Sequence, residues 1–148
     1  MKVTEAFLGE HAVFYAQFDH LEKSLATAPS LEWVKAQAQL LQPAIASHAQ
    51  LEDELLFTTL EKQMGPGGPV AVMRMEHEEI EGTLAAIPEI QDLEPARGRL
   101  LGVIQTARQH FAKEEQVLFP LAGQMLNVDQ LNRLGEGWAE RRKVDVRV

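Results

Sequence analysis

Apolar residues recur at steps of three and four through most of this sequence, and this periodicity is the feature that most constrains the fold. Four such segments, at about 4–26, 31–63, 70–87 and 95–118, are separated by breaks rich in proline and glycine. This spacing places apolar side chains along one face of an α-helix, and no segment shows the alternation of a strand. We therefore predict an all-α fold.

The breaks between the segments are short, which favours antiparallel packing of neighbouring helices. We predict an up-down-up-down four-helix bundle. At 148 residues the chain fits a single domain, 1–148, with the bundle at about 4–121 and a C-terminal extension at about 127–148. Asn127 is a candidate N-cap for a short extra helix in that extension, to which the sequence assigns no function.

Three residues mark expected helix boundaries. Ser30 is a candidate N-cap for the second segment. Pro43 lies inside that segment, where it lacks a backbone N–H and clashes with the preceding turn, so we expect a kink or a helix restart there. Pro120 is expected to bend or end the fourth segment.

Composition excludes several classes of function. A net charge of −8 provides no basic surface for nucleic acid, and no apolar run is long enough for a membrane span. The chain contains no cysteine, so any bound metal must be held by nitrogen and oxygen. We expect a cytoplasmic protein, whose oligomeric state the sequence leaves open.

The second and fourth segments contain a repeat, residues 48–57 against residues 110–119. Histidine, glutamate at plus four, leucine at plus eight and phenylalanine at plus nine coincide at one offset. A weaker echo relates Glu10-His11 in the first segment to Glu76-His77 in the third. The two halves of the chain therefore resemble copies of one helical hairpin.

Histidine–glutamate pairs four residues apart lie on the apolar stripes: His48 with Glu52, His77 with Glu81, and His110 with Glu114. Residues at this spacing share one helix face, so each pair offers an imidazole and a carboxylate in one direction. His11 takes the same place on the first segment, although a lone histidine there is more often a hydrogen-bonded core residue. Beyond the pairs, an uninterrupted α-helix predicts that the inward positions are Leu55, Thr59, Val117 and Leu121.

Burial of several carboxylates is unfavourable unless each is paired, and no inward-facing lysine or arginine lies at this level. Divalent cations are the simplest compensating charge, and three carboxylates indicate two ions. Imidazole with carboxylate suits iron or manganese, and zinc could substitute. Tyr15, one turn after His11, could reach the metals or hydrogen-bond a ligand, but we interpret it as packing. We interpret Glu54 and Glu115, which border their motifs, as either exposed or placed to support a metal ligand from outside.

At these residues the sequence resembles the hemerythrin-like HHE cation-binding family over nearly its whole length. The resemblance implies two iron ions, bridged by Glu52, Glu114 and an oxo or hydroxo group, with His11, His48, His77, His110 and Glu81 as terminal ligands. Oxygen-carrying relatives have histidine where Glu81 stands, and their fourth-helix carboxylate is at plus five, so either Glu114 or Glu115 could bridge. With Glu81 as an extra anionic ligand, we expect oxygen binding to be less reversible than in a carrier.

The family resemblance implies a protein that binds, senses or reacts with oxygen, nitric oxide or hydrogen peroxide, or that handles iron. We favour a binding or sensing protein with no dedicated catalytic residue. The alternatives are a redox enzyme of the peroxidase or nitric-oxide reductase type, and a structural bundle with one adventitious metal. Turnover with peroxide or nitric oxide, and metal analysis, separate these alternatives.

Overall fold

The computed structural model describes residues 1–146, and every regular element in that range is helical, which confirms the predicted all-α class. The long helices are α1 (Val3–Leu25), α2 (Leu31–Leu51), α4 (Gly68–Ala86) and α5 (Leu93–Lys113), and the shorter ones are α3 (Thr58–Met64), α6 (Phe119–Met125) and α7 (Val128–Arg142). A 3₁₀ turn, η2 (Ile87–Glu89), follows α4. The last two residues of the predicted C-terminal extension, 147 and 148, lie outside the described residues.

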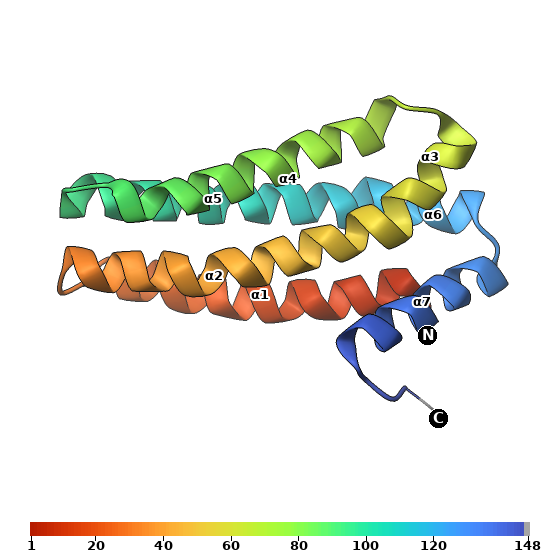
Figure 1. Ribbon diagram of the computed structural model, residues 1–148, viewed down its shortest axis with the longest axis horizontal. Helices are drawn as coiled ribbons and strands as arrows, with labels where there is room; N and C mark the ends of the chain where they lie inside the picture. The colour runs from red at the N-terminus through yellow and green to blue at the C-terminus, as the bar shows by residue number, and fades with distance from the viewer. Residues whose placement is uncertain (147–148) are drawn as a thin grey trace.

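The long helices run alongside one another as a bundle. In Figure 1, α1 and α2 lie side by side in the lower half, and α4 and α5 lie side by side in the upper half. Helix α2 also packs against α4 and α5, and α7 packs against α1. Within residues 1–146, no helix combines the length and the apolar content needed to cross a membrane.

Local capping explains where several of these helices begin and end. The Ser30 hydroxyl accepts a hydrogen bond from the Trp33 amide at 3.2 Å, and the Asn127 side chain accepts one from the Gln130 amide at 2.8 Å. Both residues are therefore N-caps, as the sequence predicts. After α3 the chain turns at Gly65, whose φ of 84° lies in the left-handed region that glycine adopts without steric cost.

The second and fourth predicted segments are each interrupted by a π-helical segment that the sequence analysis missed. These segments are η1 (Glu52–Phe57), between α2 and α3, and η3 (Glu114–Leu118), between α5 and α6. Each is closed by a bond from residue i+5 to residue i, such as that from the Thr58 amide to the Asp53 carbonyl. Both begin at the glutamate of a histidine–glutamate pair.

The π-helical segments overturn the inward positions predicted beyond the pairs. A π turn contains one residue more than an α turn, so the inward face moves forward by one position. Leu55 and Thr59 are only partly buried, whereas the next residues, Leu56 and Leu60, are fully buried. The same shift occurs in the second copy of the repeat, at residues 110–119 and just beyond. Val117 is 56% exposed and Leu121 is partly buried, whereas the residues that follow them, Leu118 and Ala122, are buried.

The helix bounds test the restart expected at Pro43 and the end expected at Pro120, and neither occurs at the proline itself. Helix α2 continues through Pro43 without a restart and ends eight residues later, at Leu51. Pro120 is the second residue of α6, which continues directly from η3. The interruption near each proline is therefore the π-helical segment, not the proline itself.

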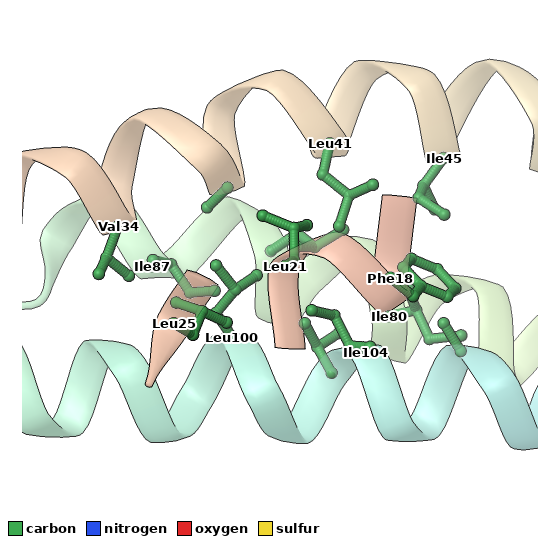
Figure 2. Close-up of a cluster of buried hydrophobic side chains, with 14 of the residues drawn as sticks. Phe18, Leu21, Leu25, Val34, Leu41, Ile45, Ile80, Ile87, Leu100 and Ile104 are labelled. Carbon is green, nitrogen blue, oxygen red and sulfur yellow. The ribbon is translucent and has the colours of Figure 1, made fainter. Parts of the chain in front are cut away.

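Apolar side chains fill the bundle in two clusters. The loop-side cluster, near the α1–α2 turn, includes Phe14, Phe18, Leu25, Val34, Ile80, Leu100 and Ile104. Figure 2 shows residues from all four long helices meeting there. The terminal cluster, near the N-terminus, includes Val3, Phe7, Leu56, Phe57, Met73 and Leu118. The two clusters share no residue, and they lie on opposite sides of the middle of the bundle.

We expect Leu100→Ala to lower the free energy of unfolding by about 2–5 kcal/mol, because Leu100 is fully buried in the loop-side cluster and its truncation leaves a cavity. Denaturant unfolding followed by circular dichroism measures the loss. The neighbouring exposed Arg99, changed to Ala, is the control and should alter stability by less than about 0.5 kcal/mol. Equal effects of the two changes would contradict the packing described.

Candidate metal centre

Buried polar and charged side chains form a layer between the two apolar clusters. They are His11, His48, Glu52, His77, His110 and Glu114, each at most 4% exposed. On α1, for example, His11 lies between Phe7 of the terminal cluster and Phe14 of the loop-side cluster. The layer is therefore shielded from solvent along the bundle in both directions.

These six side chains form two overlapping groups. His11, His48, Glu52 and Glu114 make one group, and Glu52, His77, His110 and Glu114 make the other; within each, one ligand-type atom per residue lies within 4.8 Å of all the others. Each group therefore contains two histidines of its own, and both share the two glutamates. This arrangement fits two neighbouring ions with a pair of common carboxylates.

The individual distances show how the carboxylates face both groups. Glu52 Oε1 lies 3.5 Å from His11 Nε2 and also contacts His48 Nε2, while Glu52 Oε2 lies 3.9 Å from His77 Nε2. The two oxygens of Glu52 thus border histidines of different groups.

Glu114 is placed in a similar way. Its Oε1 lies 3.3 Å from both His11 Nε2 and His110 Nε2, and its Oε2 lies 3.9 Å from His77 Nε2. All these separations exceed the usual 2.7–3.2 Å of a hydrogen bond involving nitrogen.

The inward-facing atoms of the layer lack hydrogen-bond partners. The Nε2 atoms of the four histidines and both carboxylate oxygens of Glu52 and Glu114 are buried without one. Buried polar atoms are nearly always paired, and unpaired ones carry a large desolvation cost. Eight nitrogen and oxygen donors that converge without partners are the donor set expected of a site for metal ions, so these residues fit such ions.

Each histidine of the layer donates its other ring N–H to a carboxylate on a neighbouring helical segment. His48 Nδ1 donates to Glu10 at 2.7 Å, His77 to Asp53 at 3.2 Å, His110 to Glu76 at 2.9 Å and His11 to Glu115 at 3.0 Å. Such bonds fix the tautomer, leave Nε2 free to bind a metal and raise its basicity. We call these four acidic residues the outer carboxylates.

The outer carboxylates close a ring around the bundle. Each outer carboxylate is the sequence neighbour of one inward residue and accepts a hydrogen bond from the histidine of another helix. These bonds link α1 to α2, η1 to α4, α4 to α5, and η3 to α1. The Glu10-His11 and Glu76-His77 echo is part of this ring. The sequence signal for this role is adjacency to an inward residue. Among the four outer carboxylates, sequence reasoning includes this role only for Glu115 and missed it for Glu10, Asp53 and Glu76.

The fourth-helix carboxylates and Tyr15 take distinct places. Glu114 faces inward, whereas the next residue, Glu115, is partly exposed and accepts hydrogen bonds from His11 and from the Tyr15 hydroxyl, the latter at 2.5 Å. Burial, together with this bond to Glu115, raises the pKa of Tyr15 above its ordinary value. Tyr15 therefore orients an outer carboxylate as well as packing against the core.

Glu81, the remaining residue of the predicted ligand set, belongs to neither group. It is partly buried, and burial raises the pKa of its carboxyl group despite the attraction of nearby His77. The structure thus brings six of the predicted residues together and leaves Glu81 beside them.

Without an ion, the layer distributes its charges unevenly. Burial opposes ionisation of His48, but the Glu52 carboxylate and Glu10 raise the His48 pKa to about 9. Burial also opposes ionisation of Glu52, and the His48 charge lowers its pKa well below the ordinary value. Burial and the charge of Glu52 raise the pKa of Glu114 well above its ordinary value. Burial, with repulsion from His77, lowers the pKa of His110 to about 4.

We expect metal binding to release protons, because the His48 pKa of about 9 keeps its imidazole protonated at neutral pH in the metal-free protein, and a metal ion binds only the deprotonated ring. The raised pKa of Glu114 shifts this carboxyl group in the same direction. Apparent affinity should therefore rise with pH below about 9, by about tenfold per unit for each proton displaced. Anaerobic titration with ferrous ion in weakly buffered solution measures the release. Binding that is independent of pH would contradict this charge distribution.

Comparison with known proteins adds one finding. The family model of the hemerythrin HHE cation-binding domain matches residues 2–122. The matched range contains all six residues of the buried layer and their outer carboxylates, and it ends before α7 begins. No curated protein and no solved structure matches the chain.

Proposed function

The chain belongs to the hemerythrin HHE cation-binding domain family, and from this premise we propose that its buried layer holds two iron ions that bind a small molecule. His11 and His48 would hold one ion, His77 and His110 the other, and Glu52 and Glu114 both. The observation that carries the proposal is the set of eight buried, unpartnered donor atoms, divided into two groups that share these carboxylates.

Iron is supported by the chemistry of the donors. Two imidazoles with carboxylate oxygen, and no thiolate, are typical of non-haem iron sites that keep open positions. Iron bound there would supply Lewis-acid and redox chemistry to a molecule at an open position. The outer carboxylates would hold each histidine in the tautomer that presents Nε2.

The surroundings of the layer support a small ligand. The His11 ring stacks on Phe111 with centroids 4.1 Å apart, and Phe57 stacks on His77 at 5.3 Å. With every inward residue at most 4% exposed, the site excludes bulky organic substrates. Oxygen, nitric oxide and hydrogen peroxide are small enough to enter, which favours a binding or sensing protein over an enzyme for larger molecules.

The proposal includes three expectations from the sequence. We take the bundle as an antiparallel up-down-up-down arrangement in one domain, which the short connections and the side-by-side course of the long helices support. The cytoplasmic location stays a prediction. An oxo or hydroxo group between the ions is the third expectation, and the shared carboxylates favour it because they hold the two groups together.

We expect protein produced in iron-supplemented medium to contain two iron ions per chain, measured by elemental analysis and located by anomalous scattering at the two groups. Glu52→Gln should lose at least one ion, because Glu52 borders both groups. Glu81→Gln is the matched control: it removes the same charge next to His77 and should retain both ions. If wild-type protein bound one loosely held ion, or none, the proposal of a two-iron site would be wrong. The alternative of a structural bundle would then remain.

We expect reduced, iron-loaded protein to react with oxygen without returning fully to its starting state on degassing. Glu81, the extra anion on which the sequence expectation rests, lies outside both groups, but the two shared carboxylates and the four outer carboxylates place negative charge around both ions. This charge stabilises ferric iron. Repeated oxygenation and degassing, followed by absorption spectroscopy, tests this. Reversible cycling would identify a carrier instead, and sustained turnover of peroxide or nitric oxide would identify a redox enzyme.

A further inference from the structure

Helix α7 lies outside the range matched by the family and is firmly docked on the bundle. It packs against α1 beside the N-terminus (Figure 1). Its Leu131 and Ala139 are buried, and Gly135 approaches the first residues so closely that a Cβ there would collide with the Met1 carbonyl. The helix is therefore held in one position relative to α1.

Two side chains of α7 converge on the outer carboxylate Glu10. Arg142 Nε donates to Glu10 Oε2 at 2.7 Å and Nη2 to Oε1 at 3.1 Å, and Trp138 Nε1 donates to Oε2 at 2.8 Å. Arg142 also donates to the Ser47 hydroxyl at 2.5 Å, next to His48 on α2. Three donated hydrogen bonds from one helix thus fix both oxygens of a carboxylate on another.

Glu10 passes this constraint to the buried layer. Its Oε1 accepts the Nδ1–H of His48 at 2.7 Å, and the opposite ring atom of His48, Nε2, contacts Glu52. Burial opposes ionisation of Glu10, but hydrogen bonds from His48, Arg142 and Trp138 lower its pKa to about 2. A charged carboxylate with a fixed orientation is a stronger acceptor for the imidazole N–H than a mobile one.

The other outer carboxylates are held differently. Asp53 is paired with Arg74 of α4 at 3.5 Å, Glu76 with Lys113 of α5 at 2.6 Å, and Glu115 with Tyr15 of α1. The side chain of Lys113 is 52% exposed and that of Arg142 is 26% exposed, so solvent screens the Lys113–Glu76 pair more than the Arg142–Glu10 pair. Each of these partners belongs to the bundle itself, so the anchoring of Glu10 by a helix outside the matched range makes the two groups unequal.

We propose that α7 is a positioning element for the metal centre: Arg142 and Trp138 clamp Glu10, and Glu10 orients His48 so that the ion at His11 and His48 is held more firmly than its neighbour. This inference rests on the proposed function, because it requires that the site binds two ions. It assigns a role to the C-terminal helix beyond packing.

The test compares Arg142→Gln with Arg141→Gln in iron-loaded protein. Both changes remove one positive charge from the same turn of α7, but Arg141 contacts Glu54, outside the layer and its outer carboxylates. Release of iron to a chromogenic chelator is followed under anaerobic conditions, and occupancy of each ion is measured by anomalous scattering. Trp138→Phe is a second variant that removes only the N–H donor.

Loss of the partner that hydrogen-bonds a metal-binding histidine typically weakens metal affinity by about tenfold to a hundredfold. Arg142→Gln leaves that partner, Glu10, in place, so we expect it to weaken the binding of one of the two ions by up to about tenfold, with the lower occupancy at His48. Trp138→Phe should act in the same direction but less. Arg141→Gln should match wild type, and Arg142→Lys should recover part of the effect. If α7 were purely structural, Arg142→Gln would lower the melting temperature but would release both ions at the same rate as Arg141→Gln. That result would overturn the proposal. Wild-type protein without two ions would instead overturn the proposed function.

Discussion

The structure depends on how six ionisable side chains are accommodated in a dry layer between two apolar clusters. Two carboxylates and four imidazoles present their inward atoms without hydrogen-bond partners. Desolvation of such groups costs several kcal/mol each unless opposite charge compensates it. The metal ions that we propose for this layer would provide that compensation. The fold and the ions would then stabilise one another, since binding energy at a site formed only on folding is also folding energy.

The sequence predicts the all-α class and the inward-facing histidines because both follow from one periodicity. Apolar spacing of three and four places His11, His48, His77 and His110 on the helix faces that become the core, and the caps at Ser30 and Asn127 lie where side-chain chemistry indicates. Glu81 shows the limit of this reasoning. Spacing places it on the same face as His77, but how far that face turns inward depends on packing between helices.

The π-helical segments were not predictable from spacing alone, because one extra residue in a turn leaves the local composition unchanged. Their signal was present in hindsight as adjacent apolar pairs after each glutamate, Leu55-Leu56 and Val117-Leu118, of which only the second member is buried. A strictly α-helical phase predicts instead that the first member, Leu55 or Val117, faces the core. The extra residue lies directly beside the buried glutamates, as is frequent for π turns at functional sites.

Consecutive residues of one helical segment serve two helices at four places in the bundle. In η3, Glu114 faces the shared interior while Glu115 reaches the His11 ring on α1, and in η1 the pair Glu52 and Asp53 divides in the same way toward α4. An α-helical turn separates neighbours by about 100°, which directs the second residue away from the first. The wider turn of a π segment reduces that angle. Glu10-His11 and Glu76-His77 divide in the same way within ordinary α-helix, so the ring of outer carboxylates requires only that each carboxylate is adjacent to an inward residue. The π turns instead change the helical phase beyond the buried glutamates, and this change brings Leu56 and Leu118 into the apolar core that shields the layer.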